Sequence, residues 1–174
     1  MENHPPTTSN IAKKYGLILG GYTIVSGLML FFLDMHYQNN KAVGLINLAV
    51  FIVAIVLGIL EYKKANSGFI KLSEALKSGL GIALIAGLIA VVYSLLMMNY
   101  IDPEFMEKTY EFQKETLLAE NPEMTVETVN NIIDMQKQFS GPLTTSAFIL
   151  IFNLFFGFVI ALIGGLIVRK SQPE

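Results

Sequence analysis

The sequence predicts an all-α integral membrane protein that crosses the bilayer four times. Four long blocks contain no Asp, Glu, Lys, Arg or His; they are residues 15–33, 42–60, 79–98 and 143–168. Charged residues make up only 15% of the 174-residue chain, and they gather between these blocks and near the two ends. A bilayer imposes this distribution, because a charge at its centre costs about 2.5–3.5 kcal/mol on insertion scales. We expect a single four-span domain, residues 1–174.

Each uncharged block is long enough to span a membrane as a helix. About 20 helical residues cross a hydrocarbon core of about 30 Å. The fourth block is longer and is expected to tilt or to extend beyond the core. The first block follows Lys13 and Lys14, as the apolar part of a cleaved signal peptide would. However, it is longer than such a region and ends in FFLDMHYQNN, which lacks the small residues that signal peptidase reads. We interpret it as an uncleaved span.

The distribution of Lys and Arg predicts the orientation of the spans. One side of the membrane would carry Lys13, Lys14, Lys63, Lys64, Lys71, Lys77, Arg169 and Lys170, all close to span ends. The other side would carry Lys41, Lys108, Lys114 and Lys137, together with most of the acidic residues. Positively charged loops stay in the cytoplasm. The sequence therefore predicts a multi-pass protein of the cell inner membrane with both termini in the cytoplasm.

The segment between the third and fourth blocks, residues 101–141, is predicted to form an extracytoplasmic amphipathic helical hairpin. Asp102 and Pro103 are typical of a helix start, with Asp as the cap and Pro in the first helical position. Asn121 and Pro122 interrupt the helix, and Thr125 can cap a second one.

The apolar side chains of this hairpin need a surface to lie on. The membrane interface, the outer ends of the spans and a partner protein are the alternatives. The acidic polar faces argue against simple adsorption to anionic lipid, so docking onto protein is favoured. The candidate partner-binding residues are Phe105, Tyr110, Phe112, Ile133 and Phe139.

On the inner side, the segment between the second and third blocks is predicted to contain a short interfacial helix. Asn66, Ser67 and Gly68 indicate a turn. After it, Phe69, Leu72 and Leu76 recur at helical spacing, with charged residues between them. A gating or partner-binding element is the functional alternative.

Few polar groups lie inside the spans. The candidates for intramembrane polar contacts are Asn47, Tyr93 and Asn153. Hydrogen bonds between helices from such groups contribute about 0.6–2 kcal/mol and fix packing; lining a substrate path is the alternative role. Small residues recur every four positions at Gly16 and Gly20, at Gly79, Ala83 and Gly87, and at Gly157, Ala161 and Gly165. Such stripes indicate close helix packing, within one bundle or between protomers.

The sequence lacks the residues on which several classes of function depend. There is no cysteine, the apolar blocks hold no ionisable acid or base, and the HExxH pattern is absent. Asp34 and His36 alone are weak evidence for a metal site. A net charge of −2 without a basic patch indicates no nucleic-acid partner. We therefore expect no catalytic residues, no cofactor, no metal site and no enzymatic activity.

Three stretches carry a resemblance to a known family. They read KKYGLILGG, FIKLSEALKSGLGIALIAGLIAVVYSLL and NYIDPEFMEKTYEFQKETLLAENPEMTVETVNNIIDMQKQFSGP. In these the chain resembles, from about residue 13 to 169, a bacterial membrane-protein family classed as domain of unknown function 4199. The resemblance implies four spans in an inner membrane, and it supplies no activity and no site residues.

The functional interpretation is a non-enzymatic accessory or scaffolding membrane protein. Its partners would be the lipid bilayer and another membrane or extracytoplasmic protein, or a second copy of the chain, bound by the outer segment. The alternative is a small-molecule carrier or channel subunit in which Asn47, Tyr93 and Asn153 line a path. An enzyme is the third hypothesis.

Overall fold

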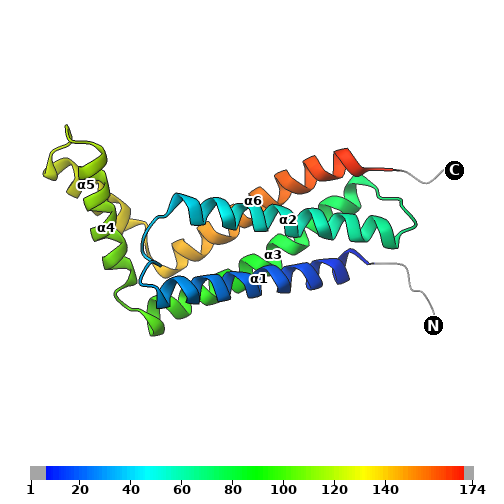
Figure 1. Cartoon of the computed structure of the whole chain (residues 1–174), viewed down its shortest axis with the longest axis horizontal. Helices are drawn as coiled ribbons and strands as arrows, with labels where there is room; N and C mark the ends of the chain where they lie inside the picture. Colours follow the sequence, from blue (N-terminus) through cyan, green and yellow to red (C-terminus); the bar gives the residue numbers. More distant parts are fainter. Residues whose placement is uncertain (1–6, 171–174) are drawn as a thin grey trace.

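The computed structural model describes residues 7–170, and its regular elements are helices. They are α1 (Thr8–Phe32), α2 (Lys41–Ala65), α3 (Leu72–Leu96) continuing into the π-helical turn η1 (Met97–Ile101), α4 (Phe105–Glu120), α5 (Val126–Gln138) and α6 (Pro142–Val168). Four of them, α1, α2, α3 with η1, and α6, are long and apolar enough to cross a membrane. They form an elongated bundle, and α4 and α5 stand at the end opposite the start of α1 (Figure 1). The all-α class and the four candidate spans are thus confirmed.

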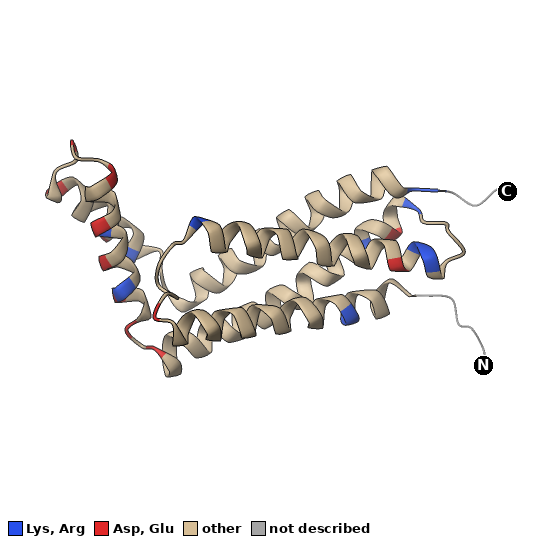
Figure 2. Cartoon of the chain, in the orientation of Figure 1, with Lys and Arg blue, Asp and Glu red and all other residues tan. Residues whose placement is uncertain are grey.

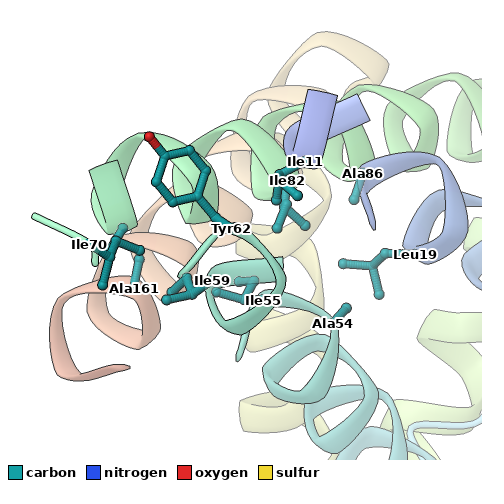
Figure 3. Packing of buried hydrophobic residues seen from close by; sticks show 11 residues of the cluster. Ile11, Leu19, Ala54, Ile55, Ile59, Tyr62, Ile70, Ile82, Ala86 and Ala161 are labelled. Carbon is teal, nitrogen blue, oxygen red and sulfur yellow. The ribbon is translucent and has the colours of Figure 1, made fainter. Parts of the chain in front are cut away.

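Helix α3 is the centre of the bundle, because it packs most extensively against α1 and α6 and also contacts α2. The core of the bundle consists of branched aliphatic and small side chains. Ile55, Ile59, Ile82 and Ala161 have almost no exposed surface, and Figure 3 shows them close together. Many Leu, Ile, Val and Phe side chains elsewhere on the long helices are exposed. A bilayer would cover such a surface, because lipid tails are as apolar as these side chains.

The small-residue stripes lie at the closest helix contacts. A methyl group added at Gly79 of α3 would overlap Ala161 of α6, and one added at Gly157 of α6 would overlap Ala83 of α3. A methyl group at Gly16 of α1 would come within 2.7 Å of a side-chain carbon of Ile85. These stripes therefore let α3 approach its neighbours closely, which is packing within one chain.

The start of α3 is tied to the end of α6. The backbones of Ile70 and Lys170 exchange two hydrogen bonds of 3.0 Å as an isolated antiparallel bridge. Of the apolar residues predicted for the interfacial helix, Phe69 precedes α3, whereas Leu72 and Leu76 lie in the first turns of α3, which runs unbroken to Leu96. The charged side chains of these turns therefore sit on the same rigid helix as the third apolar block.

In both α1 and α2, the residue that follows the C-cap has a left-handed backbone conformation. Asp34 has φ 53° and Ser67 has φ 55°. After Ser67, the N–H of Gly68 donates to the carbonyl of Lys63 at 2.8 Å, as in a Schellman motif. Glycine is usual at this position, because a side chain in the left-handed region costs about 1–2 kcal/mol for most residues.

Replacing Ser67 with glycine is expected to stabilise the protein. Ser67→Gly removes the left-handed cost but adds freedom to the unfolded chain, so the net gain should be about 0.5–1 kcal/mol. Thermal unfolding in detergent would measure it. The matched control is Ser73→Gly on the exposed side of the first turn of α3. That change should lower stability, because glycine is a poor helix former. A loss of stability in both variants would contradict the prediction.

Candidate functional site

Three ionisable side chains meet where the loop after α1 reaches the start of α4. Nε2 of His36 lies 2.7 Å from Oδ2 of Asp102. Nζ of Lys108 donates to both carboxylate oxygens of Asp102, at 3.0 and 3.1 Å. The side chains of His36 and Asp102 are only 5% and 7% exposed, and that of Lys108 is 37% exposed. We call these three residues the junction cluster, since it joins the first loop, α3 and α4.

Asp102 reaches this position because α3 changes its helical pitch at its end. Over Met97–Ile101 the backbone adopts a π-helical turn, and the N–H of Asp102 donates to the carbonyl of Met97 at 2.8 Å. Single π turns within helices are frequent at functional sites.

The predicted helix start at Asp102 and Pro103 is wrong. Helix α4 begins at Phe105, and Glu104 precedes it without a capping hydrogen bond from its side chain. The carboxylate of Asp102 accepts hydrogen bonds from His36 and Lys108 instead. Hydrogen bonds between charged groups are about twice as strong as neutral ones, so the cluster outweighs a cap worth about 1 kcal/mol.

The junction cluster keeps its acid and base ionised. Burial alone would raise the pKa of Asp102, but the hydrogen bonds from His36 and Lys108 outweigh burial and hold this pKa below its ordinary value. The hydrogen bond to Asp102 in turn raises the pKa of Lys108. The carboxylate can therefore stay buried without an uncompensated charge.

The ring of His36 is held by aromatic side chains as well as by Asp102. It stacks on Phe105 with 5.6 Å between ring centres, and Phe31 meets it edge-on at 5.1 Å. An ionised carboxylate only accepts hydrogen bonds, so Nε2 carries the hydrogen. The other ring nitrogen, Nδ1, is buried and has no hydrogen-bond partner within residues 7–170. The ring of His36 is thus held on one edge and on its face, with Nδ1 left unpartnered.

A cleft of about 710 Å³ lies beside the junction cluster, between residues 36–41 and one side of α4. Most of its lining side chains are neutral. Besides His36 and Leu117, the lining contains the amides Gln38, Asn39, Asn40 and Gln113, the hydroxyls Thr109 and Thr116, and the aromatic rings Tyr37, Phe105 and Phe112. The two charged residues, Lys41 and Glu120, are 89% and 60% exposed and lie 3.7 Å from each other. We call this region the loop–α4 cleft.

The candidate partner-binding residues are divided among three environments. Tyr110 and Ile133 are buried between α4 and α5, where they pack around Val129. Phe105 and Phe112 line the loop–α4 cleft; the first stacks on His36 and the second meets Tyr37 edge-on. Phe139, which follows α5, is 67% exposed. Of the five, Phe139 presents the largest free surface.

The candidate intramembrane polar residues lie at three separate helix contacts. The hydroxyl of Tyr22 on α1 donates to Oδ1 of Asn47 on α2 at 2.8 Å. Tyr93 of α3 lies against Gly27 of α1, and within the described residues its hydroxyl has no partner. Nδ2 of Asn153 donates to a carbonyl of its own helix, that of Ile149. The structure therefore does not bring these three side chains together.

Sequence reasoning missed the junction cluster. His36 and Asp102 are 66 positions apart, and each also fits a local role in a turn. The only signal was that Asp102 is the first charged residue after the third uncharged block, and this fits a helix cap equally well. The partner of such a group becomes evident only when α1 and α3 are packed side by side.

Comparison with known proteins gave one match. A family model described as "Protein of unknown function (DUF4199)" matches residues 14–170. No curated protein and no solved structure matches the chain significantly. The matched range includes most of α1, the other helices, the junction cluster and the loop–α4 cleft.

Proposed function

The chain belongs to the DUF4199 family of proteins of unknown function, and we propose that it is a non-enzymatic accessory or scaffolding protein of the bacterial inner membrane. In this proposal the four long helices anchor the protein, and the two-helix segment α4–α5 binds another protein outside the membrane.

The charge distribution supports this orientation. Half of the 14 acidic residues lie on α4, α5 and the turn between them, whereas a group of Lys and Arg lies at the end where α1 begins and α6 ends (Figure 2). The positive-inside rule places this basic end in the cytoplasm. The helical pair α4–α5 would then be extracytoplasmic, and the first turns of α3 would lie at the inner membrane surface.

The α4–α5 pair is built as a rigid segment. Tyr110, Val129 and Ile133 give it a small apolar core of its own. The junction cluster holds its base, because Lys108 of α4 pairs with Asp102 directly after η1. A segment that is ordered before binding loses less conformational freedom when a partner docks.

The observation that carries the proposal is an exposed apolar surface where α5 meets α6. Met135, Phe139 and Leu143 are 57%, 67% and 85% exposed. A groove of about 670 Å³ begins at Phe139 and runs along the first turns of α6; its far end, at Phe148 and Phe152, lies within the candidate span, where a bilayer would cover it. Aromatic side chains, Phe included, and Met are enriched at protein interfaces, where a few residues contribute most of the binding energy. We therefore place the partner here, with a membrane or extracytoplasmic protein, or a second copy, as the occupant.

Crosslinking in intact cells tests this surface, and the chain has no native cysteine to interfere. Phe139→Cys is expected to form an intermolecular adduct with a thiol-to-amine crosslinker, whose mass identifies a single partner or a homodimer. Glu123→Cys, in the exposed turn between α4 and α5, is the matched control and should give no such adduct. Equal adducts from both sites, or none from Phe139→Cys, would overturn the proposal.

The alternative function, a small-molecule carrier or channel subunit, has less support. It would need Asn47, Tyr93 and Asn153 along one path. Their separate hydrogen bonds and helix contacts favour a packing role for these side chains instead.

A further inference from the structure

We propose that the loop–α4 cleft binds an uncharged saccharide. The inference is independent of the partner surface at the α5–α6 junction, because the two regions share no lining residue. The loop–α4 cleft has a volume of about 710 Å³, which falls within the range of about 300–1,000 Å³ that is usual for ligand sites.

The charges around the cleft favour a neutral ligand. Lys41 and Glu120 lie at 3.7 Å from each other, so each provides the other's counter-charge. The charges of Asp102 and Lys108 are likewise paired within the junction cluster. A charged ligand would lose its hydration without gaining an unpaired opposite charge, which is unfavourable.

The neutral polar groups of the cleft match hydroxyl groups. The side-chain amides of Gln38 and Gln113 each offer donors and an acceptor, which suits a hydroxyl that also donates and accepts. The hydroxyl of Thr116 donates to the carbonyl of Phe112 at 2.8 Å, which leaves its oxygen free to accept. A sugar presents such hydroxyls at several positions, together with an apolar C–H face.

Aromatic side chains supply the surface for that apolar face. Tyr37 and Phe112 line the cleft and meet edge-on, with 6.1 Å between ring centres. Their rings are only partly buried in this structure, so a ligand would cover apolar area there.

His36 adds a second, independent observation. It lines the cleft, its side chain is 95% buried, and its Nδ1 has no partner within the described part of the chain. Buried polar atoms are almost always hydrogen-bonded.

Calorimetric titration of the full chain tests the inference. The protein is placed in phospholipid nanodiscs, because detergents with sugar headgroups would compete for the cleft. The probes are cellotetraose, maltotetraose and the tetramer of N-acetylglucosamine. At least one is expected to bind saturably, and Gln113→Leu should weaken that binding about tenfold by removing hydrogen bonds to the ligand.

The variants are chosen to leave the fold intact. Gln113 is outside the junction cluster, so Gln113→Leu should keep the thermal unfolding of the wild type, whereas a change at His36 disturbs the cluster itself. Gln138→Leu, the same replacement on the exposed side of α5, is the matched control and should bind as the wild type does. Two results would overturn the inference: no heat of binding from any probe up to about 10 mM, or equal affinities for Gln113→Leu and Gln138→Leu.

Discussion

Gly79→Val is expected to lower the free energy of unfolding by about 3 kcal/mol, the upper part of the range for overpacking a tight core. A methyl group at Gly79 already overlaps Ala161 of α6, whose Cα lies 3.5 Å from the added carbon. The neighbour is a short side chain next to its backbone, so it cannot rotate away. Helices α3 and α6 would have to separate, and this contact is one of the two most extensive in the bundle.

The matched control for this prediction is Gly44→Val. Gly44 lies on the exposed side of α2, and a methyl group added there meets nothing within 4 Å. The same change in helix propensity and apolar volume occurs at both positions, so the difference between them isolates the clash. Denaturation by SDS in mixed micelles would measure both variants. Similar losses for Gly79→Val and Gly44→Val would refute the close α3–α6 contact.

Asp102→Asn is expected to cost about 2–4 kcal/mol of stability. The replacement keeps the shape of the side chain but removes its charge, and it presents an amide where His36 donates. Lys108 is then left with the exposed carboxylate of Glu104, at 3.8 Å, as a weaker counter-charge. Removing one partner of a buried pair costs about 3–5 kcal/mol; the value here is reduced because the Lys108 side chain is 37% exposed to solvent. Asp134→Asn on the exposed side of α5 is the control and should change stability by less than about 0.5 kcal/mol.

A double-mutant cycle separates the pair from the individual side chains. Lys108→Met removes the other charge, and the combined variant should lose less than the sum of the two single losses, because no charge is then left unpaired in the cluster. Additive losses would show that Asp102 and Lys108 do not stabilise each other.

The pH dependence of the Asp102 contribution follows from its lowered pKa. The folded protein binds the proton less tightly than the unfolded chain, so protonation favours unfolding. The stabilisation is therefore complete above the ordinary carboxyl pKa of about 4 and is lost as the pH falls through the lower pKa of the folded state. The stability difference between wild type and Asp102→Asn should shrink below about pH 4 in the same SDS titration. A difference that does not change down to pH 2 would contradict the pairing.

Local signals in the sequence predicted several helix boundaries correctly. Thr125 caps α5 by accepting a hydrogen bond from the N–H of Thr128 at 3.2 Å. Asn121 follows the last residue of α4 and is its C-cap. These features depend on residues three or four positions apart, which a sequence displays directly. Asp102 has the same local features as a helix cap, but its side chain pairs with His36, which is far away in the sequence. The local features therefore predicted the wrong role for Asp102.

The sequence did not predict which aromatic side chains of α4 would be buried. Periodicity placed Phe105, Tyr110 and Phe112 on amphipathic α4, but it could not say which of them would be covered. In the structure, Tyr110 packs against α5, whereas Phe105 and Phe112 contact residues of the first loop. The periodicity of a helix shows which side chains are apolar on one face, but it does not show which of them contact α5 and which contact the first loop.

The sequence by itself determined the four apolar helices, the segregation of charge between them and the small-residue stripes. Each of these features involves consecutive or regularly spaced residues, because a bilayer sets the length of a spanning helix and the helix sets the period of its faces. Only the tertiary structure decided that α3 is the central helix, that His36, Asp102 and Lys108 meet, and that a cleft forms beside them. Those features depend on contacts between residues far apart in the chain, and their energy exists only once the helices have packed.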